Sequence, residues 1–333
     1  MISIIMQVLV LLYFDKIKFK NTGDIKIEKV QNYDKEEYKE IDYSELKDAT
    51  KIDISDDGRY ISYLQGEKFL IYDIDKNISK EIVTNEETMI LYCSWIVDEA
   101  ILVVVEKYYS ENTVSFIRIS TYNAKNNTYK VINDRLCEYI DGMQVSSIQS
   151  SIGAGTTYIG IKVNEYDSYI YKIDINDNSC RIGYYISDIG IMRAVEGYDL
   201  LIYEDVLNKQ VYYYENGING SVDISNINSP KLLGVDDEKN VYIVKLYDEK
   251  INSILYGAYN SDCTTWNTIE LDKSIDYRDV VITRNNQLYI KENNKLKNII
   301  TNEELEYTGE FIQITSNIIC SLYEDKLIIK QYR

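Results

Sequence analysis

The sequence has no histidine in 333 residues. Histidine is the usual general base near neutral pH and the commonest protein ligand of transition metals. Its absence excludes Ser-His-Asp and Cys-His catalysis, and it also excludes zinc sites that depend on histidine. An enzyme built from this sequence would have to use carboxylates and tyrosine for its acid and base chemistry.

Cysteine and proline are also scarce. The single proline leaves no proline-rich linker, and the five cysteines form no C-x-x-C pair. An odd number of widely spaced cysteines indicates neither a zinc site nor a disulfide framework. We expect free thiols buried in strands, with one bridged pair in an oxidising compartment as the alternative. The cysteines are Cys93, Cys137, Cys180, Cys263 and Cys320.

Basic side chains are too few to balance the acidic ones. Lys and Arg number 36 against 54 Asp and Glu, which gives a formal net charge of -18 and a pI near 4.6. Such a surface repels phosphate backbones, and no cluster of Lys and Arg offsets this repulsion. The sequence therefore predicts no nucleic-acid partner.

Tyrosine is the abundant aromatic residue, with 33 copies against five Phe and two Trp. A tyrosine ring packs well between sheets while its hydroxyl reaches the wet edge, so this enrichment favours β structure. Hydrophobic residues make up 45% of the chain. That content and length suffice for one large all-β domain with a buried core.

The N-terminus carries an uncharged apolar run, ISIIMQVLVLLYF, at residues 2–14. It is shorter than the roughly 17–25 residues that span a bilayer, no basic residue precedes it, and no small-x-small cleavage site follows it. Two interpretations stay open: an export or anchoring segment, and a buried element of the domain. We divide the chain into an apolar segment, 1–20, and one folded domain, 21–333, whose repeats are described next. An extracytoplasmic or membrane-anchored location is favoured over a cytoplasmic one, with membrane association expected only through 2–14.

From residue 50 onward, short apolar runs alternate with turns of Asp, Asn, Gly and Ser. Pairs of runs recur as ISYLQGEKFLIYDIDKN (61–77), YIGIKVNEYDSYIYKIDINDN (158–178) and VYIVKLYDEKINSILYGAYNSD (241–262). The interval of roughly 40–50 residues is the period of a four-stranded propeller blade. A sandwich or stacked barrel would not require such even spacing, so the sequence predicts an all-β propeller.

One repeat carries a recognisable motif. It reads Ser55-x-Asp57-Gly58, then Ile61-x-Tyr63, then Ile71-Tyr72-x-x-Asp75. This stretch resembles the TolB-like and other WD40-like bacterial β-propellers, and the remaining repeats keep the strand rhythm without the full motif. The resemblance implies a fold family whose members are mostly interaction modules, and it assigns no active-site residue.

The repeats predict about seven four-stranded blades. The count could also be six or eight, because 275–310 is thin in apolar residues. The last repeat, 311–332, has only three strands, so we expect an N-terminal strand such as 24–30 to pair with the C-terminal blade and close the ring. The acidic stretch 33–46 would then be a solvated connection.

The acid cluster of the first blade has two interpretations. Asp53, Asp56 and Asp57 offer oxygen ligands to a hard cation, but the complete calcium-loop pattern is absent. Asp and Asn also shape turns by accepting hydrogen bonds from nearby backbone amides, and Gly58 supplies a positive φ. We favour turns between the first and second strands and between the third and fourth strands of the blade. We predict no metal and no cofactor.

Ligands of propellers usually bind on the opposite face, which the loops between second and third strands help to build. There the sequence places Tyr108, Tyr109, Tyr166 and Asp167, which could stack on and hydrogen-bond a sugar or a peptide. The alternative is a set of ordinary solvated loops. Arg193 and Arg284 are expected on inner strands near the channel, where each would meet an anionic ligand or pair with an acid.

Three functions fit these observations. The leading hypothesis is a non-catalytic propeller that binds a protein or glycan partner, at the cell envelope in one version. The second is a glycosidase or polysaccharide lyase that uses carboxylates and tyrosine, for which two acids would have to converge in the channel. The third is a structural or sensory domain of a larger assembly, which an exposed apolar patch would favour.

Overall fold

The computed structural model describes residues 38–42, 46, 49–84, 88–96, 99–109, 114–283 and 287–332. Residues Glu37–Arg333 form one compact unit. The segment 1–20 lies outside the described residues, so our predictions of export and membrane attachment remain predictions. In the described part of the chain, no helix is both long and apolar enough to cross a bilayer.

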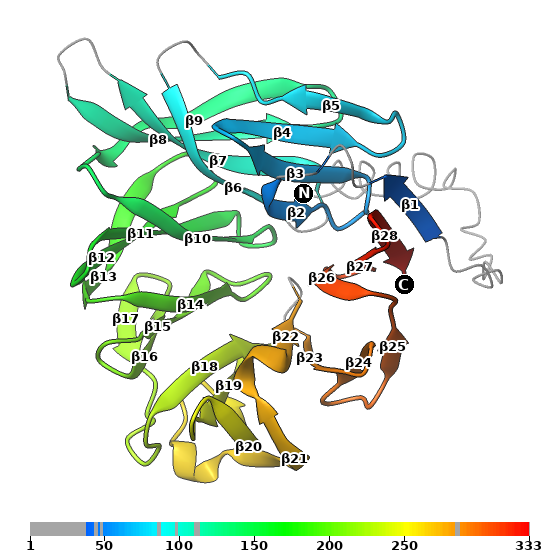
Figure 1. Ribbon diagram of the computed structural model, residues 1–333. Helices are drawn as coiled ribbons and strands as arrows, with labels where there is room; N and C mark the ends of the chain where they lie inside the picture. Colours follow the sequence, from blue (N-terminus) through cyan, green and yellow to red (C-terminus); the bar gives the residue numbers. More distant parts are fainter. Residues whose placement is uncertain are drawn as a thin grey trace, which may run out of the picture. The chain divides into compact units, whose positions relative to one another are not determined.

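The described strands form seven four-stranded antiparallel sheets around a common axis (Figure 1). In six sheets, the four strands follow one another in both sequence and space. We call the sheets blades 1 to 7 and name the strands of each blade a to d, from the axis outward. Two short 3-10 helices, Cys263–Thr265 and Tyr277–Asp279, lie in blade 5 and in its connection to blade 6. The seven-bladed propeller predicted from the repeats is therefore confirmed.

The strands of the first four blades are β2 (Thr50–Ile54), β3 (Tyr60–Gln65), β4 (Lys68–Asp73) and β5 (Ile78–Glu81) in blade 1, β6 (Thr88–Trp95), β7 (Ile101–Tyr109), β8 (Ser115–Asn123) and β9 (Thr128–Glu138) in blade 2, β10 (Gln144–Ser151), β11 (Thr156–Asn164), β12 (Asp167–Ile173) and β13 (Ser179–Ile186) in blade 3, and β14 (Ile189–Ala194), β15 (Leu200–Asp205), β16 (Gln210–Glu215) and β17 (Ile218–Ser221) in blade 4.

The remaining strands are β18 (Pro230–Val235), β19 (Asn240–Lys245), β20 (Lys250–Ala258) and β21 (Asn267–Asp276) in blade 5, β22 (Val280–Ile282), β23 (Leu288–Glu292), β24 (Lys295–Asn298) and β25 (Glu304–Glu306) in blade 6, and β26 (Glu310–Ile314), β27 (Ile318–Tyr323), β28 (Lys326–Gln331) and β1 (Tyr38–Asp42) in blade 7.

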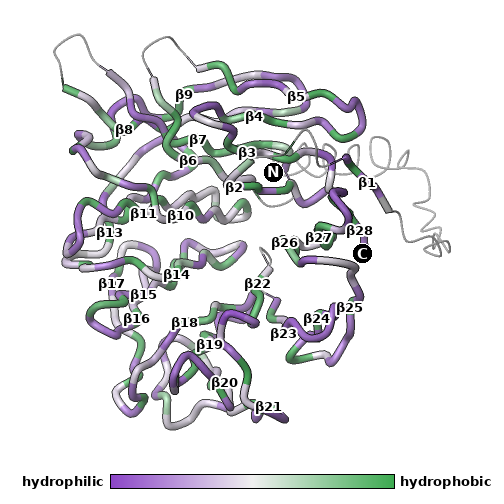
Figure 2. Tube along the Cα trace, viewed as in Figure 1, coloured by the Kyte–Doolittle hydropathy of each residue, from purple (hydrophilic) through white to green (hydrophobic). Residues whose placement is uncertain are grey.

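Each blade buries both of its faces against its neighbours, which explains the nearly continuous apolar runs. Alternate residues of a strand belong to different cores because side chains point to opposite faces. In β3, Ile61 and Tyr63 pack with Ile318 and Leu327 of blade 7, whereas Tyr60 lies in the core shared with blade 2. Figure 2 shows the hydrophobic residues that run along β3, β4 and β7.

Several tyrosines lie at the ends of these cores, where they contact both the core and a turn. Tyr158 and Tyr242 are buried at the start of the second strand of their blades. The Tyr158 hydroxyl donates to Asp199 at 2.6 Å, and the Tyr242 hydroxyl donates to Asp236 at 2.8 Å. One side chain thus fills a core with its ring and holds a turn carboxylate with its hydroxyl, which supports the structural interpretation of the tyrosine content.

The ring is closed by an N-terminal strand, as predicted. Strand β1 pairs antiparallel with β28 and supplies the d strand of blade 7, with Ile41 opposite Leu327. Ile41 is 6% exposed and packs in the core between blades 7 and 1. The pairing covers the β28 edge, which would otherwise present unpaired backbone groups.

The position of the closing strand differs from our expectation. The segment 24–30 lies outside the described residues, and the acidic stretch 33–46, predicted to be a connection, contains β1 itself. An outer strand buries only one face and carries charges on the other, so Ile41 provides the apolar contact while its neighbours stay polar. The high density of charged residues therefore led us to predict a solvated connection where the structure has a strand.

Candidate functional site

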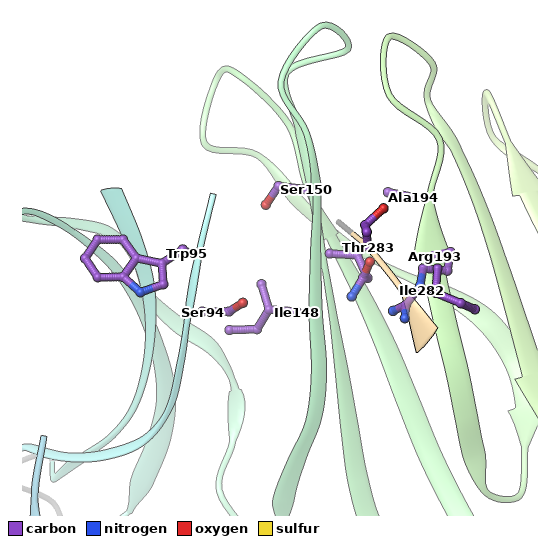
Figure 3. Close-up of a pocket in the computed structure, with 9 residues that line it drawn as sticks. Ser94, Trp95, Ile148, Ser150, Arg193, Ala194, Ile282 and Thr283 are labelled. Atoms are coloured by element: carbon purple, nitrogen blue, oxygen red, sulfur yellow. The ribbon is translucent and has the colours of Figure 1, made fainter. Parts of the chain in front are cut away.

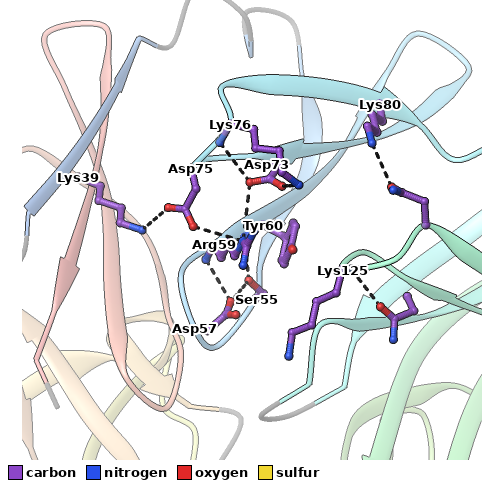
Figure 4. Close-up of polar contacts among 12 residues, drawn as sticks. Lys39, Ser55, Asp57, Arg59, Tyr60, Asp73, Asp75, Lys76, Lys80 and Lys125 are labelled. Atoms are coloured by element: carbon purple, nitrogen blue, oxygen red, sulfur yellow. Dashed lines mark hydrogen bonds and ion pairs between the residues drawn. The ribbon is translucent and has the colours of Figure 1, made fainter.

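The acidic motif of blade 1 forms two turns at one end of the blade (Figure 4). Asp57 accepts hydrogen bonds from the Ser55 hydroxyl at 2.6 Å and from the Arg59 backbone amide at 3.1 Å. Gly58 has a φ of 63°. These contacts are those of a hydrogen-bonded turn, as predicted, and they join strands a and b.

Arg59 links this turn to the next one. Its Nε lies 3.3 Å from Asp75 and 3.8 Å from Asp73, both at the c–d turn. Burial opposes ionisation of Asp73, but side-chain and backbone hydrogen bonds from Lys76 outweigh it and hold the Asp73 pKa below its usual value. The a–b and c–d turns therefore lie at the same end of the blade, and their carboxylates are neutralised locally.

The other two acids of the cluster join neighbouring blades. Asp53 on β2 accepts hydrogen bonds from Gln313 Nε2 of β26 at 2.8 Å and from the Trp95 amide of β6 at 3.4 Å. Asp56 is buried and accepts a hydrogen bond from the Ser316 amide of blade 7 at 3.5 Å. Among the described residues, no three His, Cys, Asp or Glu side chains form a group that could hold a metal ion. The observed contacts assign these acids to blade packing.

The opposite end of the propeller carries the b–c loops, and several large apolar side chains are exposed on them. Tyr166 is 75% exposed in the loop of blade 3, Leu207 is 51% exposed in that of blade 4, and Tyr247 is 59% exposed in that of blade 5. Tyr109, at the end of β7, is 45% exposed, with the Lys107 ammonium 4.9 Å from its ring centroid. We call this set of four residues the b–c patch.

Two other predicted residues lie beside the b–c patch and are tied to their own blades. Tyr108 is half-buried beneath the Arg118 guanidinium, which lies 3.8 Å from its ring centroid. Asp167, the first residue of β12, accepts a hydrogen bond from the Tyr169 hydroxyl that raises the Tyr169 pKa. These two side chains hold the loops in place, whereas Tyr109 and Tyr166 face solvent.

A cavity of about 90 Å³ lies among the inner strands (Figure 3). Blades 2, 3, 4 and 6 contribute to it, each with the last residues of its a strand or the residue that follows. It therefore lies toward the end of the channel that carries the a–b turns. Its lining consists of Ser94, Trp95, Ile148, Gln149, Ser150, Arg193, Ala194, Ile282 and Thr283.

The structure separates the predicted site residues into two groups. Arg193 lies in the cavity at the a–b end, whereas the predicted tyrosines and Asp167 lie at the b–c end. Arg284 lies outside the described residues. None of the described residues that line the cavity is a carboxylate, so the described lining supplies no acid pair of the kind that glycoside hydrolysis uses.

Sequence reasoning did not select the other polar residues of the cavity. Ser94, Gln149 and Thr283 are distant in sequence and carry no motif. What they share is a position near or just beyond the end of an inner strand, close to an a–b turn. That position is the one signal that could have indicated them.

The sequence matches no protein-family model and no curated protein. Solved structures do resemble the fold. A chain in the crystal structure of the mitotic checkpoint complex aligns with a TM-score of 0.53 and 10% identity, over 92% of this chain and 97% of that chain. The β-propeller domain of Cps50 (Swd1) from Myceliophteria thermophila aligns with a TM-score of 0.51 and 10% identity, over 86% and 96%.

A prolyl endopeptidase also aligns, with a TM-score of 0.49 and 10% identity, over 78% of this chain and 42% of the enzyme. Identities near 10% define a shared fold and assign no activity. The resemblance stated from the Ser55-x-Asp57-Gly58 motif is thus supported by the blades themselves: the chain has the fold of a seven-bladed, WD40-like β-propeller.

Proposed function

We propose that this chain is a non-catalytic β-propeller that binds a protein partner through the b–c patch. The supporting observation is the exposure of Tyr109, Tyr166, Leu207 and Tyr247 on four successive blades at one end of the molecule. Exposed aromatic residues supply a large contact area at a small cost in side-chain entropy, and they are enriched where proteins bind one another.

The composition of the b–c patch favours a protein over a glycan. Sugars stack on flat aromatic rings, whereas Leu207 and its neighbour Val206, which is 38% exposed, are branched aliphatic side chains. Aliphatic side chains beside tyrosines match the apolar centre of a protein interface. The b–c loops of blades 4 and 5 would form the centre of the proposed contact.

A paired capture experiment tests this proposal. One variant combines Leu207→Ser with Tyr247→Ser at the b–c end, and the matched control combines Ile175→Ser with Ile300→Ser. The control residues are 79% and 55% exposed in c–d turns, so both variants remove two exposed apolar side chains. Circular dichroism first verifies that both variants are folded.

We expect the original protein and the control to capture the same proteins, and the b–c variant to lose them at least about tenfold, as measured by quantitative mass spectrometry. A tenfold loss corresponds to about 1.4 kcal/mol, the range of a moderate interface residue. Equal capture by all three proteins, or loss from the control alone, would contradict the proposal.

A further inference from the structure

Arg193 occupies an unusual position in the inner-strand cavity. It is the fifth residue of β14, and its side chain lines the cavity together with Ser94, Ser150 and Thr283 from other blades (Figure 3). The chain carries 54 acidic residues, but no Asp or Glu lines this cavity in the described structure. Within the described lining, Arg193 is therefore a cation without a neighbouring carboxylate.

The guanidinium is poorly satisfied by the protein. Its Nη1 donates to the carbonyl of the preceding residue, Met192, at 3.1 Å. Its Nε is buried and has no hydrogen-bond partner. Burial lowers the pKa of Arg193, which shows that its surroundings disfavour the charged form.

Two other shielded cations of the described chain are paired with carboxylates. Lys231 lies 2.8 Å from the buried carboxylate of Glu204, and Lys172 pairs with Asp199. Arg118 also has a buried Nε and Nη1 without hydrogen-bond partners, but its guanidinium stacks on the Tyr108 ring. Among the described residues, Arg193 has neither a carboxylate within ion-pair distance nor an aromatic ring stacked on its guanidinium, so an uncompensated charge remains beside the cavity.

The size and donors of the cavity define what would compensate it. A volume of about 90 Å³ has room for a small group of heavy atoms, since a single water needs roughly 10–15 Å³ of cavity volume. Ser94 and Thr283 add hydroxyl groups to the lining of the same cavity. Arginine binds carboxylate and phosphate oxygens with two parallel N–H groups, and Nε is one of the groups used in that geometry.

We propose that this cavity binds a small oxyanion group, a carboxylate or a phosphate, with Arg193 as its charged ligand. The site lies toward the a–b end of the channel, away from the b–c patch. The proposed oxyanion site is therefore separate from the proposed protein-binding face, and an experiment that contradicts one proposal does not contradict the other.

Thermal unfolding in separate titrations of inorganic phosphate and acetate, with chloride at matched ionic strength as reference, tests the site. Arg193→Met removes the charge and keeps an unbranched apolar chain. Lys125→Gln removes one charge from an exposed turn residue and serves as control. We expect the original protein and the control to gain about 2–4 °C in Tm with at least one oxyanion. A response to phosphate alone identifies a phosphate site, and a response to acetate alone identifies a carboxylate site.

Arg193→Met should lose this response, and its Tm without oxyanion should not fall, because an uncompensated buried charge has been removed. Arg193→Lys keeps the charge without the planar fork and should bind the oxyanion at least about tenfold more weakly, which gives a readout even where the Met variant does not fold. An unchanged response in either variant, or no response of the original protein to either oxyanion, would overturn the proposal.

Discussion

At the scale of single residues, Gly58 and Gly66 of blade 1 have the same backbone conformation and different surroundings. Their φ angles are 63° and 62°, in the left-handed region that favours glycine. A Cβ on Gly58 would lie 3.2 Å from Ile318 Cγ2 of blade 7, whereas a Cβ on Gly66 would meet nothing within 4 Å. The motif glycine thus serves both a turn and the contact between blades 7 and 1.

The two glycines form a matched pair of variants. Gly66→Ala should lower the free energy of unfolding by about 1 kcal/mol through backbone strain alone. Gly58→Ala should lower the free energy of unfolding by about 1–3 kcal/mol more, because the added methyl group would crowd the packed contact between blades 7 and 1. Urea unfolding followed by tryptophan fluorescence measures both values. Equal losses would show that the contact with Ile318 has no energetic importance.

Individual residues also mark the limits of prediction from sequence. The turn formed by Ser55, Asp57 and Gly58 was predictable, because its hydrogen bonds connect residues close in sequence. The position of Arg193 on an inner strand was predictable from the strand rhythm. The cavity around Arg193 was not predictable, because Ser94 and Thr283 belong to other blades. No local sequence pattern indicates that residues so far apart in the chain line the same cavity.

At the scale of elements, closure of the ring depends on one short strand. Among the β1 residues whose burial is described, 39–42, Ile41 is the one buried apolar side chain, and it packs in the core of blades 7 and 1. The need for an N-terminal strand was predictable, because the last repeat has three strands. Its location was not, since four of its five residues are polar or aromatic, as in many solvated connections.

Two neighbouring substitutions test the closing strand. Ile41→Ala should lower the free energy of unfolding by about 2–4 kcal/mol, because it opens a cavity in the closing core. Glu40→Ala removes an exposed ion pair with Lys326, whose atoms are 2.7 Å apart, and should cost less than about 1 kcal/mol. Urea denaturation of both variants provides the comparison. If the Ile41 variant lost no more than the Glu40 variant, β1 would not be an integral strand of blade 7.

At the scale of the whole molecule, the propeller places the acidic turns of blade 1 and the b–c patch at opposite ends. The a–b and c–d end of blade 1 holds its carboxylates in turns with Arg59 and Lys76, while the b–c end exposes Tyr166, Leu207 and Tyr247. The blade count and the opposition of these ends followed from the repeats. The exposed fraction of each loop residue did not, because it depends on how far a loop extends beyond its neighbours.

Hydrogen–deuterium exchange of the chain, alone and with a captured protein partner, tests the central claim most directly. The account predicts slower exchange on binding in peptides that cover the b–c loops of blades 3, 4 and 5, at 164–167, 206–209 and 246–249. Peptides that cover the a–b turns at 55–59 and 195–199 should exchange at unchanged rates. Protection confined to the a–b turns, or no protection of the b–c loops, would contradict binding through the b–c patch.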